Sequence, residues 1–308
     1  MNKTLLSYLL IIGICGVAGV GSGVILKRTL GPIDEMYPPG FDPSEFSANI
    51  EEIYGKYETL SNKTYDGVAN SVNPKFSNSD IANIVLENYR RNENNYSLGI
   101  GVADAGIVAQ TIRSAQIKKG NTYFEEQISY SSMVSVANRS IQEGKDGGVD
   151  LYGGSASGPE TASYPEGPTQ KFDRAGYKSY LGKSLDEMFI YIISDKTTTK
   201  SSVSKKGDDV ELYLELNPNI STFNYKIQMQ NISGLANLPP FSEVKLTYTF
   251  SKDLELKHLH VDETYVATKS GIPYPAKTHN LIEYYYYSND ASRDIPKSNE
   301  AINYSQEA

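Results

Sequence analysis

Histidine and carboxylate side chains in the C-terminal part of the sequence are the first candidates for chemistry. His258 and His260 are two positions apart, so on a β-strand they share one face. Asp262 and Glu263 follow closely, and histidine and carboxylate are ordinary zinc ligands. A zinc site built on this segment would draw on the third histidine of the chain, His279.

The position of His279 depends on how two predicted strands, 255–266 and 280–288, pair. If they form a hairpin, His279 lies opposite about Val266, which places it roughly 20 Å from His260 at ~3.4 Å per residue. The three histidines then cannot share one ion. Histidines that face solvent on a strand are the simpler interpretation, so the sequence predicts no metal and no cofactor.

Motifs for a nucleophilic enzyme are incomplete. Ser202 to Lys205 matches the SxxK pattern of penicillin-binding enzymes, but it lies in an extended stretch rather than opening a helix. The glycine- and serine-rich run 153–158 does not fit GxSxG, and neither GxGxxG nor a P-loop is present. Glu125 and Glu126 alternate on a predicted strand, so they cannot form the facing pair of a glycosidase. We expect no enzyme activity; an extracytoplasmic hydrolase is the weakest alternative.

Composition limits the class of partner. The chain of 308 residues can bury a large core, and its net charge of −8 argues against nucleic acid, whose recognition needs a basic surface. Tyrosine, with 24 residues, favours β-strands or an aromatic binding surface. The single cysteine, Cys15, lies in the N-terminal hydrophobic segment, so the remaining chain has no disulfide. This pattern fits a bacterial protein outside the cytoplasm.

Residues 1–30 are a predicted membrane anchor or signal segment. Leu5 to Leu26 carries no charge and matches the ~20 residues with which a helix crosses a bilayer. Cleavage as a signal peptide near Gly19 and Gly21 is the alternative. We therefore expect a single-pass protein of the cell membrane whose main domain is extracytoplasmic.

Helix and loop signals precede and interrupt a β-rich region. Residues 31–78 are predicted to contain a linker and a helix, and residues 79–288 an antiparallel β domain with a mid-chain helix. The predicted elements are a linker at 31–40, a helix from Asp42 to about Leu60, a second helix capped by Ser79 and ending near Arg91, a mobile loop at 153–168 and a helical stretch at 172–194.

Alternation of apolar and polar residues predicts the strands. In an antiparallel sheet such alternation gives one covered and one solvated face. The predicted strands are 97–103, 106–118, 121–131, 132–142, 149–152, 210–216, 223–229, 244–250, 255–266 and 280–288. The polar tail, 289–308, is predicted to be disordered.

The order of these elements resembles that of LolA/LppX-type extracytoplasmic proteins. The phrases that carry the resemblance are IANIVLENYRRN, IKKGNTYFEEQISYSS and VELYLEL, within residues 79–288. The resemblance implies an α+β fold in which a curved, half-barrel-like sheet shelters acyl chains beneath helices. The sequence departs from the lipoprotein members at Cys15, which lacks a proper lipobox.

The first functional hypothesis is therefore a membrane-anchored binding protein that holds a lipid or another amphiphile. The candidate groove residues are apolar residues of the second β-rich block: Leu212, Leu214, Phe223, Tyr225, Met229, Tyr248 and Phe250. A packed core is the alternative interpretation of the same pattern. A second hypothesis is a surface structural or interaction protein that contacts another envelope protein through the Tyr284–Tyr287 run or the 153–168 loop, without a small ligand.

Overall fold

The computed structural model describes most of the chain that follows the N-terminal hydrophobic segment. The described residues are 32–106, 108–132, 135–144, 146–187, 189–233, 237–269, 272–286, 294–296, 302 and 304. The predicted membrane segment, residues 1–30, lies outside them. Within the described residues, no helix combines the length and hydrophobicity needed to cross a membrane.

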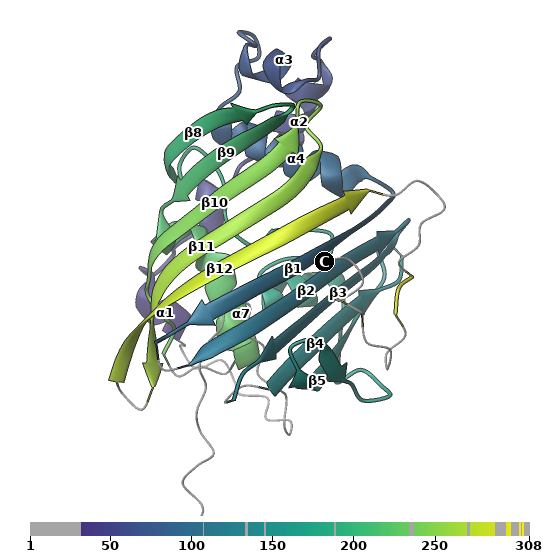
Figure 1. The fold of residues 1–308 in the computed structure, drawn as a ribbon, viewed down its shortest axis with the longest axis vertical. Coiled ribbons are helices and arrows are strands. Elements are labelled where there is room, and N and C mark those ends of the chain that lie inside the picture. Colours follow the sequence, from purple (N-terminus) through teal and green to yellow (C-terminus); the bar gives the residue numbers. More distant parts are fainter. Residues whose placement is uncertain are drawn as a thin grey trace, which may run out of the picture.

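One large antiparallel sheet of 12 strands forms the frame of the molecule (Figure 1). The strands are β1 (Asn94–Asp104), β2 (Ala109–Lys119), β3 (Thr122–Tyr130), β4 (Ser135–Gln142), β5 (Val149–Gly158), β6 (Thr161–Ser163), β7 (Gln170–Phe172), β8 (Thr198–Lys206), β9 (Asp209–Leu216), β10 (Phe241–Ser251), β11 (Leu256–Lys269) and β12 (Ile272–Tyr286). Their spatial order is β6-β5-β4-β3-β2-β1-β12-β11-β10-β9-β8, and β7 pairs with β5.

The pairing of β1 with β12 joins an N-terminal series of hairpins to a C-terminal one. Its register runs from Asn95 opposite Tyr286 to Asp104 opposite Lys277. Because β6 and β8 lie at opposite ends of the strand order, the sheet is not closed. The predicted α+β class with a curved antiparallel sheet is confirmed at this level.

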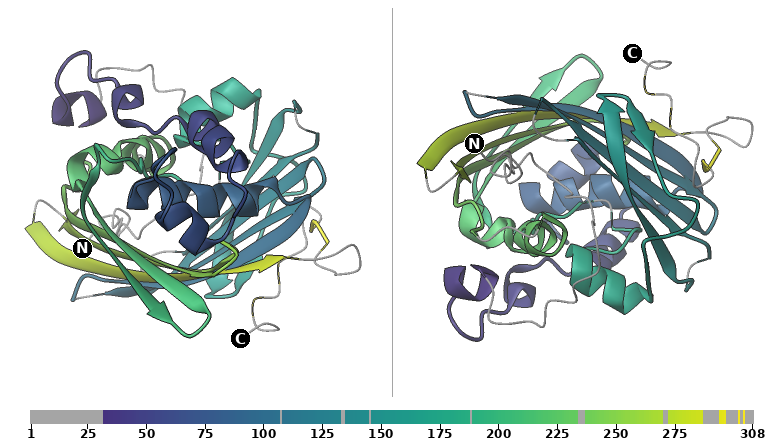
Figure 2. Two further views of the ribbon diagram at one scale, coloured as in Figure 1. Left: turned by 90° about the horizontal axis from the view of Figure 1, so that it is seen from above. Right: turned by 90° about the horizontal axis from the view of Figure 1, so that it is seen from below.

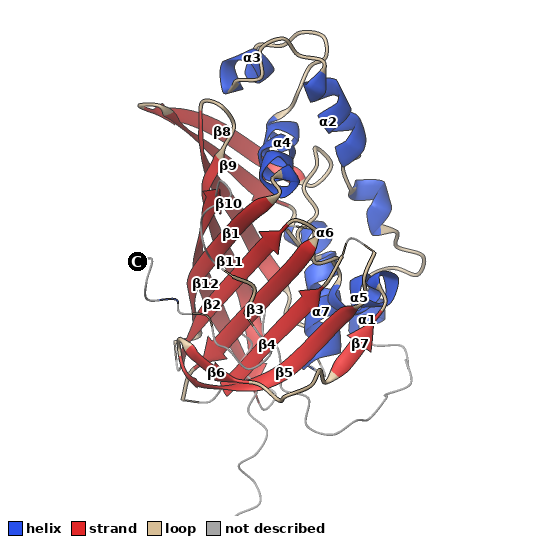
Figure 3. Cartoon of the chain, turned by 90° about the vertical axis from the view of Figure 1, so that its right-hand side faces the viewer, coloured by secondary structure: helices blue, strands red, loops and turns tan. Residues whose placement is uncertain are grey.

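The helices gather on the concave side of the sheet (Figures 2 and 3). They are α1 (Pro32–Met36), a 3₁₀ helix (Pro43–Phe46), α2 (Ile50–Glu58), α3 (Tyr65–Ala69), α4 (Asn78–Arg91), α5 (Arg174–Leu181), α6 (Pro218–Ser221) and α7 (Phe223–Ser233). Ile302 and Tyr304 lie on the opposite, convex side, where they pack with apolar residues of β1–β4. The two faces of the sheet are therefore covered by different parts of the chain.

Helix α4 begins with a complete capping box. The Ser77 hydroxyl accepts from the backbone N–H of Asp80, and the Asp80 carboxylate accepts from the backbone N–H of Ser77. Ser77 is thus the N-cap in place of the predicted Ser79, which lies inside the helix and is buried. The predicted apolar stripe is buried as expected: Ile81, Ile84, Val85 and Tyr89.

The prediction of a strand at 223–229 is wrong, because these residues form α7. Asn217 caps the preceding turn, its side chain accepting from the N–H groups of Asn219 and Ile220, and Pro218 occupies the first helical position. Tyr225 and Met229 are four residues apart, so the same residues that alternate along a strand also share one face of a helix. Both are fully buried.

The predicted helix at 172–194 is helical only in α5. Gly182 ends α5 at a φ of +76°, and a side chain there would overlap the backbone carbonyl of Asn224. The described residues from 182 to 193 form neither α-helix nor β-strand.

Two further boundaries also differ from the prediction. The predicted helix from Asp42 to Leu60 is interrupted between the 3₁₀ helix and α2, because Asn49 caps α2 separately. The predicted mobile loop at 153–168 contains ordered β structure, since β5 continues to Gly158 and pairs with β6.

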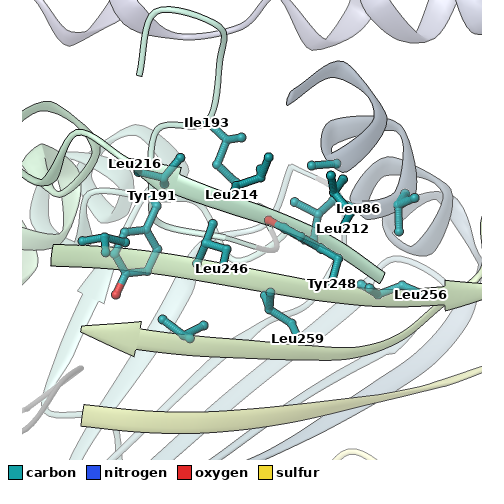
Figure 4. Packing of buried hydrophobic residues seen from close by; sticks show 14 of the residues in the cluster. Leu86, Tyr191, Ile193, Leu212, Leu214, Leu216, Leu246, Tyr248, Leu256 and Leu259 are labelled. Atoms are coloured by element: carbon teal, nitrogen blue, oxygen red, sulfur yellow. The ribbon is translucent and has the colours of Figure 1, made fainter. Parts of the chain in front are cut away.

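Among the described residues there are three apolar clusters, and the two largest lie on opposite faces of the sheet. The larger one packs α2, α3 and α4 against the inner face of β9–β11, and Figure 4 shows Leu86 of α4 beside Leu212 and Tyr248. The smaller one lies on the convex face of β1–β4. It includes Ile302 and Tyr304, which are 4% and 5% exposed although the sequence predicts a disordered tail.

Tyr304 is fixed by a buried ion pair. Glu126 and Arg139 lie opposite each other on β3 and β4, and their side chains are fully buried. The Tyr304 hydroxyl donates to Glu126 Oε2 at 3.2 Å.

Candidate functional site

A cavity of about 110 Å³ lies against the inner face of the sheet, where the N- and C-terminal hairpins meet. Its floor is formed by β12, β1, β2 and β3. A second wall comes from the described residues of 182–193, here called the covering segment, which contributes Lys183, Phe189, Ile190 and Tyr191. Gln228 of α7 completes the lining. The cavity is partly open to solvent.

Two glycines in the middle of β1 keep the floor free of side chains. Gly99 and Gly101 both face the cavity. A Cβ atom on Gly99 would overlap the Ser114 hydroxyl, and one on Gly101 would overlap the Asn280 side chain. Glycine in a strand interior weakens the strand and often marks close approach of another group. Here the missing side chains make room for polar groups from both neighbouring strands.

The strand register sets the order of polar and apolar groups across the floor. Val261, Asn280, Gly101 and Ile112 form one transverse row from β11 to β2. At the other end of the floor, Ser97, Gln116 and Glu125 form a row from β1 to β3. The lining is therefore mixed, with apolar walls and a few polar groups, as is common for small-molecule sites.

A charged pair attaches the covering segment to the floor. The Lys183 ammonium contacts Glu125 Oε2, and the Gln116 amide donates to the same oxygen at 2.8 Å. Only 8% of the Lys183 side chain and 19% of the Glu125 side chain are exposed. Because a partly buried pair costs desolvation, losing one partner would leave the other charge uncompensated.

A second contact attaches the covering segment near the opposite end of the cavity. The Tyr191 hydroxyl donates to Glu263 Oε1, and Glu263 is 2% exposed. Burial raises the pKa of Glu263 to about 8, although the Tyr191 hydrogen bond acts in the opposite direction. The Glu263 carboxyl is therefore mostly neutral at pH 7.

The covering segment also separates the cavity from a polar cleft on its other side. Phe189 and Tyr191 line both spaces. Asp186 of the same segment accepts from Arg174 at 2.6 Å and lies 3.7 Å from Arg90. Asn83 of α4 donates to the backbone carbonyl of Ile193 at 3.2 Å. The segment is thus attached by side-chain contacts and by a backbone hydrogen bond from the Ile192 N–H to the Ser221 carbonyl at 3.0 Å, and its described residues belong to no helix or strand.

The sequence-predicted groove residues lie beside the cavity rather than in its lining. All except Phe223 are fully buried in the larger apolar cluster: Leu212, Leu214, Tyr225, Met229, Tyr248 and Phe250. Figure 4 shows how Leu212, Leu214 and Tyr248 meet α4 and the strands around them. Phe223 contacts the rings of Tyr37 and Phe41 on the helical side. Their role as ligand contacts stays a prediction.

The predicted position of His279 is wrong. The β11–β12 register places His279 opposite Asp262, and the His279 Nδ1 atom lies 2.5 Å from the Asp262 carboxylate. His260 is opposite Leu281, so His279 lies only two residues, or ~7 Å, away along the sheet. His258 lies 3.9 Å from Glu283. Even so, the described residues contain no group of three or more potential ligands positioned for a metal ion.

Other candidates from the sequence are dispersed. Ser202 lies in the same transverse row as His260 but three strands away, roughly 14 Å at ~4.8 Å per strand. In the tyrosine run, Tyr284 is buried and Tyr285 stacks on Tyr96. Tyr286 accepts a hydrogen bond from the backbone N–H of Leu256. Tyr287 lies outside the described residues.

The sequence contained one signal for the cavity, the glycine pair Gly99 and Gly101 within a strand pattern. The contribution of Asn280 and Ser114 depends on register across β12, β1 and β2, which alternation alone does not specify. The irregular conformation of the covering segment was not predicted, because its apolar residues suggested a helix.

Comparison with known proteins gives weak structural similarity only. No family model and no curated protein matches the sequence. Among solved structures, a DUF1329 family protein from Desulfovibrio piger is similar with a TM-score of 0.27 and 10% identity, over 70% of this chain and 93% of that one. A porin-like protein from Bacteroides uniformis is similar with a TM-score of 0.19 and 11% identity, over 62% and 95%. Both similarities are too weak to carry a functional argument, and they assign the chain to no family.

Proposed function

We propose that this protein is a membrane-anchored, extracytoplasmic binding protein that holds a lipid or another amphiphile against the inner face of its open sheet. The observation that carries the proposal is the cavity beneath the covering segment, with the side-chain-free positions Gly99 and Gly101 in its floor. The location is supported by the uncharged stretch from Leu5 to Leu26 and by a chain that has no cysteine beyond Cys15.

The size of the cavity limits what it can enclose. A cavity of ~150 Å³ in another protein holds benzene, so about 110 Å³ accommodates a group of only a few heavy atoms. A longer acyl chain must extend through the open side or displace the covering segment. Because the described residues of that segment belong to no strand, its displacement leaves the sheet hydrogen bonds intact.

A cavity-filling variant tests the proposal. Ser114→Phe places a ring in the cavity, whereas Thr111→Phe places the same ring on the opposite face of β2. The full-length protein and both variants are purified identically from the native host, and bound species are measured by native mass spectrometry and organic extraction. We expect an amphiphile to copurify with the wild type and Thr111→Phe, and to be depleted at least tenfold in Ser114→Phe.

Equal amphiphile content in all three proteins, or none in any of them, would contradict the proposal. Thermal denaturation of each variant distinguishes a filled cavity from a misfolded protein. The Thr111→Phe control matters because an added exposed ring can itself recruit detergent or lipid.

Protein–protein contact is a second candidate function, supported by one surface feature. Ile100 and Val102 project from the convex face of β1 and are 42% and 43% exposed. Leu281 lies opposite Ile100 on β12. Adjacent exposed apolar side chains are typical of contact surfaces. Replacing Ile100 and Val102 by serine would reduce crosslinking to an envelope protein if this surface binds one.

A further inference from the structure

Buried polar atoms that have no hydrogen-bond partner among the described residues lie just beyond the lining at one end of the cavity. Val261 and Asn280 line the cavity, and the next inward-facing pair on β11 and β12 is Glu263 and Thr278, directly opposite each other. Their side chains are 2% and 0% exposed. Within the part of the chain that the structure describes, Glu263 Oε2 and Thr278 Oγ1 have no hydrogen-bond partner.

Two glutamines add to this group from other elements. Gln228 of α7 lines the cavity and is 5% exposed, and its Oε1 atom has no hydrogen-bond partner among the described residues. Gln110 of β2 is 1% exposed, and no described residue forms a hydrogen bond with its side-chain oxygen or nitrogen. Gln110 lies in the same transverse row as Thr278, with only the small side chain of Ala103 between them. We refer to Glu263, Thr278, Gln228 and Gln110 as the polar end.

Burying these polar atoms without hydrogen-bond partners destabilises the folded state. A buried polar atom without a hydrogen bond costs ~1–3 kcal/mol, and folded proteins contain few of them. Five such atoms belong to Gln228, which lines the cavity, and to Glu263, Thr278 and Gln110, which adjoin its lining, so a polar group bound at this end would supply partners for them. That group must both donate and accept, because the side-chain oxygens of Gln228 and Gln110 only accept, whereas the Gln110 amide nitrogen only donates.

The charges of the nearby side chains limit which polar group a ligand could place at the polar end. The Lys183 ammonium contacts Glu125, whose row lies at the opposite end of the floor. Burial raises the pKa of Glu263 to about 8, so the carboxyl is mostly neutral at pH 7. No cationic side chain belongs to the polar end, so an anionic group would be buried there without a counter-charge, which is costly. A neutral group that carries hydroxyls meets all these conditions.

We propose that the polar end binds the neutral, hydroxyl-bearing head group of an amphiphile, such as a glycerol ester, with the acyl chain directed past Ile112, Ile282 and Phe189 toward the open side. The inference rests on the proposed function and specifies its ligand class and orientation. A glycerol group has few enough heavy atoms for a cavity of about 110 Å³.

Head-group preference tests the inference. Monododecanoylglycerol, dodecanoate and dodecylamine share one chain length, and their binding to the full-length protein is measured by calorimetry below the critical micelle concentrations. We expect the glycerol ester to bind at least tenfold more tightly than either charged probe. Thr278→Val and Gln228→Leu each remove a hydrogen-bonding group and should weaken the ester about five- to tenfold. Thr247→Val, on the convex face, should leave its affinity unchanged.

Each other outcome has a defined meaning. Equal affinity for all three probes, insensitive to Thr278→Val and Gln228→Leu, would overturn the head-group inference while amphiphile binding stands; the polar end would then hold water. Tightest binding of dodecylamine, lost in Glu263→Gln, would overturn it in favour of a cation site. If no probe binds and no amphiphile copurifies, the proposed function itself fails. Circular dichroism of each variant verifies the fold.

Discussion

At the residue scale, Glu263 makes the stability of the folded protein depend on pH. It is buried on the inner face, accepts a hydrogen bond from Tyr191 and has a pKa of about 8 instead of the usual 4.5. The folded state therefore holds more protons than the unfolded state between these two values. This contribution to stability is fully present below pH 4.5 and is lost as the pH rises through 8.

We predict that Glu263→Gln removes this pH dependence. The difference in unfolding free energy between the variant and the wild type should change by a few kcal/mol between pH 5 and pH 8, at ~1.4 kcal/mol per pKa unit, with the wild type losing stability. Urea denaturation followed by tyrosine fluorescence measures it. The exposed turn variant Asp253→Asn should follow the wild-type curve, and a Glu263→Gln curve parallel to the wild type would contradict the assignment.

Only part of the candidate site could be predicted from the sequence, and two glycines illustrate this. Gly99 and Gly101 interrupt an otherwise apolar strand pattern, and this is a local signal that a close approach occurs there. What approaches them could not be predicted, because Ser114 and Asn280 come from strands β2 and β12. Likewise, the buried Glu126–Arg139 pair becomes visible only when the β3–β4 register is known.

At the element scale, the covering segment depends on its charged contact with the sheet. Lys183→Met leaves Glu125 largely buried without its cation, which should lower stability by about 2–3 kcal/mol, somewhat less than for a fully buried pair. Hydrogen–deuterium exchange of the described residues 183–187 and 189–191 should become faster.

Lys178→Met is a matched control for Lys183→Met. Lys178 of α5 pairs with Glu187, but 54% and 41% of these side chains are exposed, so its loss should cost only about 0–1 kcal/mol. Similar exchange rates in both variants would show that the ion pair to Glu125 does not hold the segment.

The elements that the sequence predicted well are those whose local signals agree. Alternation and turn residues located β1 to β4, and Gly120, with a φ of +56°, lies in the β2–β3 turn where a turn was expected. At 223–229 the same residues fit both the period of a strand and that of a helix, and they form α7, which follows the short helix α6. His279 was predicted opposite Val266, four residues from its actual partner, Asp262. The register of the β11–β12 hairpin is set at its turn, which lies far from the histidines.

At the scale of the whole molecule, the open sheet divides into a filled and a hollow part. Helices α2, α3 and α4 fill the concave side of β9–β11, where Leu212, Leu214 and Tyr248 are fully buried (Figure 4). Next to this core, the inner face of β12, β1 and β2 is covered by an irregular segment and retains the cavity. The filled part contains the larger apolar cluster, and the hollow part retains the cavity in which we propose that an amphiphile binds.

The convex side is covered separately. Tyr304 and Ile302 protect the apolar surface of β1–β4, and Tyr304 donates to Glu126. The tail residues that the structure describes therefore complete the sheet from outside. A ligand on the concave side does not compete with them.

Photocrosslinking tests the central claim, that the hollow inner face holds the amphiphile, most directly. Full-length protein is irradiated with a monoacylglycerol that carries a diazirine in its chain, and labelled residues are located by mass spectrometry of peptides. We predict labels on inward-facing residues of β1, β2 and β12, such as Ile112 and Ile282, and on Phe189, with labelling suppressed by Ser114→Phe. Labels confined to the convex face, at Ile100 and Val102, would contradict the account.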